Sequence, residues 1–406
     1  MSDRRRTDIV KPALPLLALM MAVGPFGDTE YTPAMPSIAH SLGTSYGLVQ
    51  ITMTSYLIGS GVSELAYGPL ADRYGRRPIM IIGAGILSLG ALICLLSFWI
   101  WPLIAGRLVQ GVGACAGGVV AKAMVRDSYP AEQRERVYAQ LQAAFALAPA
   151  IGPVVGSLVT HVTSWHYNFA ILLALSLLLW LLVWRYLPET KPNRNRRALE
   201  PARLWRNYKR PLAAPDFMFY AILAGCCIGV VYTALLGAPH IVISVLQLGT
   251  GAVVIVAVAI LIGFVTGAGA CALVSNRVRD IWIISAGLAV LIIGSIAQLA
   301  VALIVGKHGN LAEYLAPTAI CFIGVGLVVP VCTTNAMAPF KRTAGAASSM
   351  LGFTQMTTAA IGTIAMSVLS FSSVYSMPIV FLGLSVLATL IFVGYFFLRG
   401  ITTVRR

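Results

Sequence analysis

Two acidic residues lie in an apolar stretch that is otherwise suited to crossing a lipid bilayer. Asp28 and Glu30 fall near the end of the first long apolar run, 13–36, together with Pro25, Pro33 and Pro36. A carboxylate at the centre of a spanning helix costs about 2.5–3.5 kcal/mol, so such groups persist mainly where they face protein or water. The pattern therefore predicts a proton-binding site in this segment, with the other helices packed around it.

The spacing of the two acids limits how they can share one site. Residues two apart point about 200° apart on a straight helix, so only one of them is expected to face a given cavity. Pro33 has no N–H to donate to the carbonyl of Thr29, and a kink at this point would bring the two acids closer together. Asp28 and Glu30 are therefore both candidates for the proton site.

A basic residue lies at a matching depth in another predicted span. Arg107 belongs to the run Gly106–Gly113 of the apolar stretch 101–125. An arginine keeps its charge, so inside a membrane it needs a carboxylate or a water-filled cavity. Arg107 and Glu30 each lie about 9 Å from the outer end of their span, and Asp28 lies about 12 Å from it. We expect Arg107 to act with these acids in proton coupling.

A third acid lies in the predicted span 47–68. Glu64 is about 6 Å from the cytoplasmic end of its span, and Lys122 is about as far from the end of the span 101–125. We interpret the two residues as an ion pair that neutralises both charges. The alternative is that Glu64 is a second proton site.

Composition indicates an all-α membrane protein. The 406 residues are 58% hydrophobic and only 11% charged, with a mean hydropathy of +0.84, whereas soluble domains average about 25% charged residues. A helix needs about 20 apolar residues to cross the hydrocarbon core. Twelve such runs are predicted, at 13–36, 47–68, 78–98, 101–125, 137–160, 166–187, 216–238, 248–272, 281–303, 313–337, 344–369 and 376–398.

These runs contain no group of residues typical of an enzyme site. No catalytic His/Asp/Ser arrangement and no metal-ligand cluster is apparent, so we expect neither catalysis nor a metal, and no cofactor beyond a proton gradient. The seven cysteines have no metal or redox spacing, and we interpret them as packing residues. They all fall inside predicted spans: Cys94, Cys115, Cys226, Cys227, Cys271, Cys321 and Cys332.

The net charge of +15 is explained by topology and not by nucleic-acid binding. Of the 29 Lys and Arg residues, all but Arg107, Lys122 and Lys307 fall in the two terminal tails, in the even-numbered loops or at their edges. Cytoplasmic loops of membrane proteins carry an excess of Lys and Arg. We therefore expect both termini to lie in the cytoplasm.

The longest loop, Pro188–Pro215, divides the spans six and six. The predicted units are an N-terminal six-helix bundle over 1–187, a cytoplasmic linker over 188–215 and a C-terminal six-helix bundle over 216–406. Two such halves fit the parallel-repeat plan of transporters, which bind substrate between the halves near the midplane. For the stretch around Leu204, Trp205 and Tyr208 we favour a solvated linker; the alternative is a short amphipathic helix on the membrane surface.

The loop between the second and third spans carries a specific motif. Its sequence is Gly-Pro-Leu-Ala-Asp-Arg-Tyr-Gly-Arg-Arg-Pro over 68–78, and it resembles the signature loop of the major facilitator superfamily. In that superfamily the aspartate and arginines latch the loop to neighbouring helix ends and help to set the balance between inward-open and outward-open states. The resemblance implies this gating role for Asp72, Arg73 and Arg76, with Arg126 and Asp127 as partners.

Further segments point to one branch of the superfamily. The string over 148–156 resembles the motif of its antiporters, which implies that Pro149, Gly152, Pro153 and Gly156 shape the fifth span. The run 106–113 resembles the motif whose arginine is linked to proton transfer. The segment 345–356 resembles the corresponding part of the Bcr/CflA-like group of drug:proton antiporters. Together these resemblances cover nearly the whole chain.

The chain departs from that group at the first acid. The group's usual acidic position corresponds to Thr29, which here lies between Asp28 and Glu30. The sequence Thr29-Glu30-Tyr31 also looks like the Thr-Glu-Phe segment of a related branch that exports sugars and nucleosides, where the glutamate is the functional acid. On this resemblance we expect Glu30 to be the main proton site and Asp28 the alternative.

The expected function follows from these resemblances. We expect a monomeric, proton-coupled antiporter that exports small lipophilic or cationic drugs across the bacterial inner membrane by alternating access. The alternative is a proton-coupled exporter of one metabolite class, such as a sugar, nucleoside, amino acid or siderophore. The residues expected to line the substrate cavity are Tyr31, Tyr56, Tyr232, Asn335 and Gln355.

Overall fold

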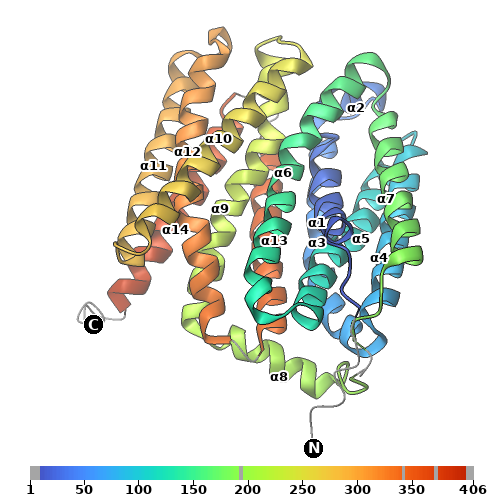
Figure 1. Cartoon of the computed structure of the whole chain (residues 1–406). Helices are drawn as coiled ribbons and strands as arrows, with labels where there is room; N and C mark the ends of the chain where they lie inside the picture. The colour runs from blue at the N-terminus through green and yellow to red at the C-terminus, as the bar shows by residue number, and fades with distance from the viewer. Residues whose placement is uncertain (1–9, 192–194, 341–342, 370–373, 399–406) are drawn as a thin grey trace, which may run out of the picture.

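The computed structural model describes residues 10–191, 195–340, 343–369 and 374–398, and this part of the chain is built from helices (Figure 1). The elements are α1 (Leu14–Thr29), η1 (Thr32–Ala34), α2 (Met35–Ser41), α3 (Tyr46–Tyr74), α4 (Arg76–Leu95), α5 (Ile100–Ser128), α6 (Ala131–Val162), α7 (His166–Tyr186), α8 (Pro201–Leu212), α9 (Pro215–Pro239), η2 (His240–Val245), α10 (Thr250–Val274), α11 (Asp280–Ile304), η3 (Gly306–His308), α12 (Leu311–Met337), η4 (Ala338–Phe340), α13 (Ala344–Val368) and α14 (Ser376–Leu398).

Twelve of these helical segments correspond to the twelve predicted spans, if α1, η1 and α2 are taken as one crossing. Within the described residues, nine helices are long and apolar enough to cross a membrane by composition alone. The crossings outside this group are the broken first one and the pair α3 and α13. The last two pack against each other and carry buried polar residues such as Thr54 and Thr363, which lowers their hydropathy.

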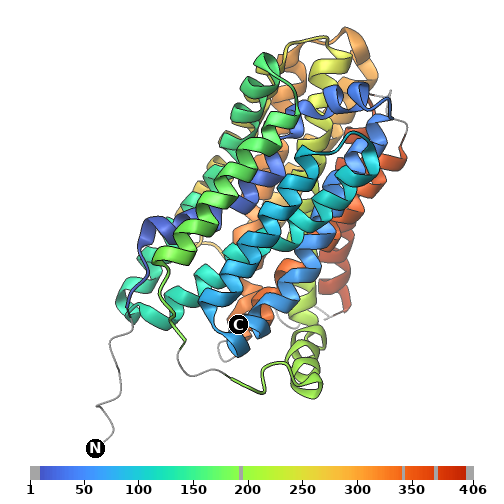
Figure 2. The same cartoon turned by 90° about the vertical axis from the view of Figure 1, so that its right-hand side faces the viewer.

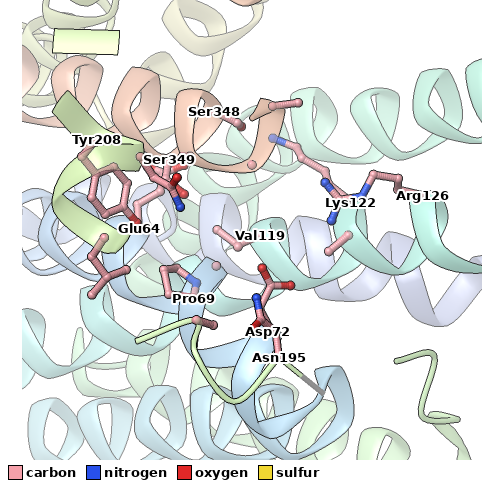
Figure 3. A pocket seen from close by; sticks show the side chains of 18 of the residues that line it. Glu64, Pro69, Asp72, Val119, Lys122, Arg126, Asn195, Tyr208, Ser348 and Ser349 are labelled. Atoms are coloured by element: carbon pink, nitrogen blue, oxygen red, sulfur yellow. The ribbon is translucent and has the colours of Figure 1, made fainter. Parts of the chain in front are cut away.

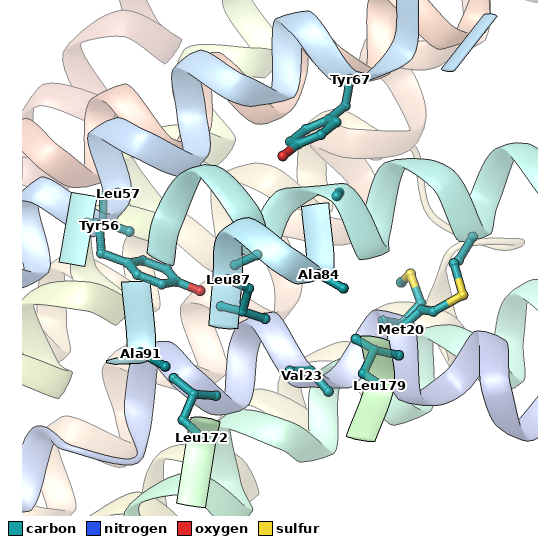
Figure 4. Packing of buried hydrophobic residues seen from close by; sticks show 14 of the residues in the cluster. Met20, Val23, Tyr56, Leu57, Tyr67, Ala84, Leu87, Ala91, Leu172 and Leu179 are labelled. Carbon is teal, nitrogen blue, oxygen red and sulfur yellow. The ribbon is translucent and has the colours of Figure 1, made fainter. Parts of the chain in front are cut away.

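The helices form two bundles that meet along α3 and α13 and along α6 and α10. The first bundle, α1–α7, has an apolar core that joins α1, α3, α4, α5 and α7; Figure 4 shows Met20, Tyr56, Leu87 and Leu172 within it. A second core lies within α9–α14 and includes Cys227, Phe322 and Phe381. The bundles follow one another in the chain, as Figure 1 shows by colour.

The molecule has two ends, and the long helices run between them (Figure 2). We call them the α8 end, where α8 crosses beneath the bundles, and the α2 end, where α2 lies (Figure 1). The predicted topology places basic residues at the α8 end. Nine of them, in the two tails, in the linker and in the loop before α13, lie outside the described residues: Arg4, Arg5, Arg6, Arg194, Lys341, Arg342, Arg399, Arg405 and Arg406.

The first crossing is broken at the position where the prolines predict it. Helix α1 ends at Thr29, a 3-10 turn follows over Thr32–Ala34, and α2 begins at Met35. Because Pro33 has no N–H, it cannot donate to the Thr29 carbonyl as the next helical turn would. The hydroxyl of Thr32 donates to that carbonyl instead, over 2.8 Å. The kink expected from Pro33 is therefore present, and it lies directly beside the two acids.

The linker between the bundles contains a helix, which the favoured interpretation of a solvated linker did not include. The Tyr208 hydroxyl of α8 donates to the backbone carbonyl of Leu65 on α3 over 2.5 Å. Arg203 and Tyr208 on one face are half-buried, whereas Trp205 and Arg206 on the other face are exposed. The helix forms because residues spaced three to five apart can then reach the bundle together.

Candidate functional site

Arg107 lies at the centre of the first bundle and is completely buried. Its guanidinium carbon is 4.1 Å from the ring centroid of Tyr31 and 4.3 Å from that of Tyr56. Nη1 donates to the backbone carbonyl of Gly27 over 2.8 Å and to Oε1 of Gln110 over 2.7 Å. Cation–π contacts of this kind gain strength when water is excluded.

Arg107 forms no direct ion pair with an acid of the first crossing in the part of the chain that the structure describes, and its expected part in proton coupling stays a prediction. Among the described residues, no carboxylate oxygen lies within 4 Å of a nitrogen of Arg107. The Gly27 carbonyl accepts from the guanidinium, and the rings of Tyr31 and Tyr56 lie beside it. Arg107 is therefore held by dipoles and π-faces in place of a carboxylate.

Asp28 joins the two bundles. Its Oδ2 accepts a hydrogen bond of 2.8 Å from the hydroxyl of Tyr232, which belongs to α9 of the second bundle. Asp28 is 5% exposed, and its second oxygen, Oδ1, is buried and has no hydrogen-bond partner among the described residues. A carboxylate has capacity for several donors, so Asp28 retains unused acceptor capacity at the interface between the bundles.

Glu30 is enclosed and has no donor. It is 1% exposed, and neither carboxyl oxygen has a hydrogen-bond partner among the described residues. The two acids thus lie in different surroundings: Asp28 contacts the second bundle, while Glu30 follows the end of α1 and is packed against α6 of its own bundle.

The segment 148–156 of α6 packs directly on the break in the first crossing. A Cβ atom on Gly156 would collide with the backbone carbonyl of Glu30, and one on Gly152 would collide with the hydroxyl of Thr29. Pro149 and Pro153 lie inside α6 on the same stretch. Glycine at these two positions therefore allows α6 to reach the backbone that carries both acids.

A charged network holds the helix ends together at the α8 end. Arg76 is 1% exposed; its Nη2 lies 2.8 Å from Oδ1 of Asp72, and its Nε lies 3.0 Å from Oδ2 of Asp127. The Lys191 ammonium also contacts Oδ1 of Asp72. Arg126 lies 3.6 Å from Asp127. One buried arginine therefore ties α3, α4 and α5 together, and Lys191 adds the segment after α7.

Asp72 lies beyond the predicted span 47–68, near the end of α3. Burial raises the pKa of Asp72, but the hydrogen bond from Lys191 and the charge of Arg76 lower it, and the net pKa is below the ordinary value of 3.8. Arg73, for which the resemblance implies the same role, is exposed and lies over the ring of Tyr74, 5.3 Å from its centroid, outside this network.

Two members of the network were missed by sequence reasoning. Glu189 accepts the backbone N–H groups of Arg76 and Arg77 over 3.0 and 3.2 Å, which caps the start of α4. Lys191 contacts Asp72. Both residues follow the end of α7, far from the loop in sequence. The available signal was a charged pair directly after a predicted span.

A cavity of about 340 Å³ lies at the α8 end between the bundles. Figure 3 shows Glu64 and Tyr208 on one side of it and Lys122 and Arg126 on the other. The predicted ion pair between Glu64 and Lys122 is therefore wrong as a direct contact: within the described part of the chain, no ion pair within 4 Å joins them. They face each other across the cavity, which both side chains line.

The residues expected to line a substrate cavity fall into separate places. Tyr31 and Tyr56 contact Arg107, and Tyr232 contacts Asp28, so these three share one region. Asn335 donates to Asp280 at the start of α11 over 2.8 Å and belongs to the α8 end of the second bundle. Gln355 is half-buried on α13.

Other contacts between the bundles lie toward the α2 end. The Tyr46 hydroxyl donates to the carbonyl of Leu236 over 2.9 Å, and the hydroxyls of Thr54 and Thr363 lie 2.8 Å apart. In the same region as Tyr46, Gln50 is completely buried, and neither its oxygen nor its nitrogen has a hydrogen-bond partner among the described residues. No pattern in the sequence had singled out these residues, since each depends on a neighbour from a distant segment.

The sequence of this chain is similar to those of known membrane proteins. A family model described as the Major Facilitator Superfamily matches residues 17–366. Multidrug resistance protein D of Escherichia coli (strain K12) is 29% identical over 350 residues, which are 83% of this chain and 84% of that protein. Multidrug resistance protein MdtL of Salmonella newport (strain SL254) is 28% identical over 374 residues, which are 90% of this chain and 91% of that protein.

Solved structures show the same fold. A bacterial homolog of the human lysosomal transporter Spinster has a TM-score of 0.75 at 15% identity and covers 94% of this chain and 95% of its own. A D-xylose-proton symporter has a TM-score of 0.73 at 15% identity, with 93% of this chain and 96% of its own covered. These likenesses concern the fold, which in the described part of the chain consists of twelve crossings in two bundles of six.

The chain belongs to the Major Facilitator Superfamily. The fold class and the family resemblance predicted from the sequence are both confirmed.

Proposed function

We propose that this protein is a proton-coupled antiporter that exports small lipophilic or cationic compounds from the bacterial cytoplasm. The multidrug resistance proteins among its relatives support the export of drugs. The observation that carries the proposal is the hydrogen bond between Asp28 of the first bundle and Tyr232 of the second. It makes one acid, buried at membrane depth, part of the contact between the two halves.

The orientation follows from the positive charges. The positive-inside rule assigns the α8 end to the cytoplasm and the α2 end to the outside, with both termini cytoplasmic. Hydrogen bonds from Tyr46 and Thr54 join the halves toward the α2 end, and the cavity lies at the α8 end. In this orientation the structure is closed toward the outside and hollowed toward the cytoplasm.

Asp28 and Tyr232 offer a route for coupling. A cationic substrate that arrives from the cytoplasm competes with the Tyr232 hydroxyl for the carboxylate of Asp28, and its binding removes a contact that holds the halves together. After the halves rock, the acid faces the outside, where it takes up a proton and releases the cation. The protonated acid then returns to the cytoplasm-facing state, where it releases its proton to the cytoplasm and its carboxylate is again available to Tyr232 or to a new cationic substrate.

Glu30 has a complementary role in this proposal. An ionised carboxylate that is buried without a donor costs many kcal/mol, so its proton is retained in the closed state. Movement of α6 away from the first crossing would open its surroundings, because Gly152 and Gly156 of α6 lie directly against Thr29 and the backbone of Glu30. The sequence-based preference for Glu30 over Asp28 as the main proton site stays a prediction that single variants decide.

The test uses purified protein in proteoliposomes with ethidium, a lipophilic cation, as substrate and an imposed proton gradient. We expect gradient-driven ethidium transport with proton movement in the opposite direction, measured with a pH-sensitive dye. Asp28→Asn should abolish the coupled proton movement, whereas Arg206→Gln on the exposed face of α8 should not. Transport that persists unchanged without a gradient and in an Asp28→Asn/Glu30→Gln double variant would rule out the antiport mechanism.

A second candidate is an exporter of one metabolite class. The specific observation in its favour is the sequence Thr29-Glu30-Tyr31, with its resemblance to the sugar- and nucleoside-exporting branch. A susceptibility panel of chemically unrelated drugs, applied to cells that do and do not express the protein, separates the two candidates. Resistance to several unrelated drugs supports drug export, and resistance to none supports the metabolite exporter.

A further inference from the structure

The cavity at the α8 end is bordered by both bundles and by the linker helix. Its walls come from α3, α5, α6, α8 and α13, with Glu64, Lys122, Arg203 and Ser349 among the residues that line it. Its volume of about 340 Å³ lies within the range of roughly 300–1,000 Å³ that is typical of small-molecule sites. We call this cavity the vestibule.

The charges that line the vestibule fall into two groups. Asp72 and Arg76 are bound to each other, and Arg126 lies beside Asp127. Glu64, Lys122 and Arg203 also line the vestibule, and no ion pair or side-chain hydrogen bond involves them in the part of the chain that the structure describes. One acidic and two basic side chains thus line a common space without an ion pair within 4 Å between them in the described residues.

The carboxyl group of Glu64 packs against α13. A Cβ atom on Gly352 of α13 would overlap the carboxyl group of Glu64, so this carboxyl group lies directly on the backbone of the second bundle. Glu64 is two turns of α3, about 12 Å, from Asp72 and therefore lies deeper in the protein. Lys122 is on the opposite side (Figure 3), and Arg203 belongs to α8, which covers the α8 end.

We propose that the vestibule is an entry site for amphoteric small molecules, those with both a cationic and an anionic group. The ammonium of such a molecule binds Glu64, and its carboxylate binds Lys122 and Arg203. A molecule with only a negative group leaves Glu64 unmatched, and one with only a positive group leaves two cations unmatched; each case loses electrostatic complementarity. The role as an entry site rests on the proposed function, whereas the binding itself does not.

The test measures binding to the full-length protein in detergent or nanodiscs, with three related probes. Norfloxacin carries a carboxylate and a piperazine ammonium at opposite ends of a rigid fluorescent ring system. Its ethyl ester retains only the cation, and its N-acetyl derivative retains only the anion. We expect norfloxacin to bind about tenfold more tightly than either derivative, the factor for one lost charge-assisted contact.

Variants assign each contact to a side chain. Glu64→Gln should weaken norfloxacin and the ester about tenfold and leave the N-acetyl derivative unchanged. Lys122→Gln and Arg203→Gln should weaken norfloxacin and the N-acetyl derivative and leave the ester unchanged. Arg206→Gln is the matched control, because it removes the same charge from the exposed face of the same helix. It should leave the binding of all three probes unchanged.

Two results would overturn the proposal. The first is equal affinity of the wild-type protein for all three probes, a measurement that needs no variant and no assumption about folding. The second is an equal effect of Arg203→Gln and Arg206→Gln, which would indicate general attraction by a basic surface. Failure of gradient-driven transport with retained probe selectivity would contradict only the proposed function. If transport is coupled to the gradient but the three probes bind with equal affinity, only the proposal of the vestibule as a binding site is contradicted.

Discussion

The hydroxyl of Tyr232 donates a 2.8 Å hydrogen bond to Oδ2 of Asp28, and the two residues belong to different halves of the molecule, 204 positions apart in the chain. An acid that serves as a contact between the halves responds to anything that competes for it. In the proposed mechanism a proton and a cationic substrate both compete for this carboxylate, so the binding of either one would shift the same equilibrium between conformations.

The strength of this contact is measurable in a double-mutant cycle. Asp28→Asn and Tyr232→Phe should each lower the stability of the purified protein, and their combined effect should be smaller than the sum by about 1–3 kcal/mol. Thermal unfolding in detergent measures each change. Tyr314→Phe, which removes a hydroxyl bound to Gly306 within the second half, is the control and should add independently to Asp28→Asn. Full additivity of the Asp28 and Tyr232 variants would contradict a coupled pair.

Gly156→Ala should impair both stability and transport. Its new methyl group would overlap the carbonyl of Glu30 and force α6 away from the break in the first crossing, at a cost of about 1–3 kcal/mol. Gly118→Ala in α5 is the matched control, because a Cβ there meets nothing within 4 Å. That control should be neutral or stabilise the helix by up to about 1 kcal/mol. Equal behaviour of the two variants in unfolding and ethidium transport assays would show that α6 does not need this close approach.

Substitution of Arg76 should lower stability much more than substitution of Arg73, although both residues belong to the same loop motif. Arg76→Gln leaves Asp72 and Asp127 without their shared arginine. It should lower the free energy of unfolding by up to about 3 kcal/mol. This is the low end for breaking a buried ion pair, because both carboxylates are partly exposed. Arg73→Gln should have little effect, because Arg73 is exposed and outside the network. Unfolding and transport rates of both variants check this. A larger loss with Arg73→Gln would support the role implied by the family resemblance over the contacts seen here.

The network at the α8 end should also respond to acid. The pKa of Asp72 is below its ordinary value of 3.8 in the folded protein, so ionised Asp72 contributes stability that is fully present above that value. This contribution is lost as the pH falls through the folded pKa, because the unfolded state takes up the proton first. The stability difference between wild type and Asp72→Asn should therefore be constant from about pH 7 to pH 5 and narrow below pH 4. A difference that stays constant down to pH 3 in thermal unfolding scans would contradict the ion-pair account.

The sequence determined the parts of this protein that depend on local composition. Apolar runs of membrane-spanning length predicted all twelve crossings, and Pro33 predicted the break beside Asp28 and Glu30, since a missing N–H acts on its own helix whatever surrounds it. The family resemblance of the loop motif implied that Asp72, Arg73 and Arg76 act together with Arg126 and Asp127; all of these except Arg73 are joined in the network.

Only the tertiary structure decided which buried charges have partners. Depth along a helix suggested that Arg107 meets an acid and that Glu64 meets Lys122, but depth does not determine the direction in which a side chain points. Arg107 lies between two tyrosine rings, Glu64 lies against the backbone of α13, and Asp28 binds Tyr232. These partners come from distant segments, and helix packing, which no local pattern specifies, brings them together.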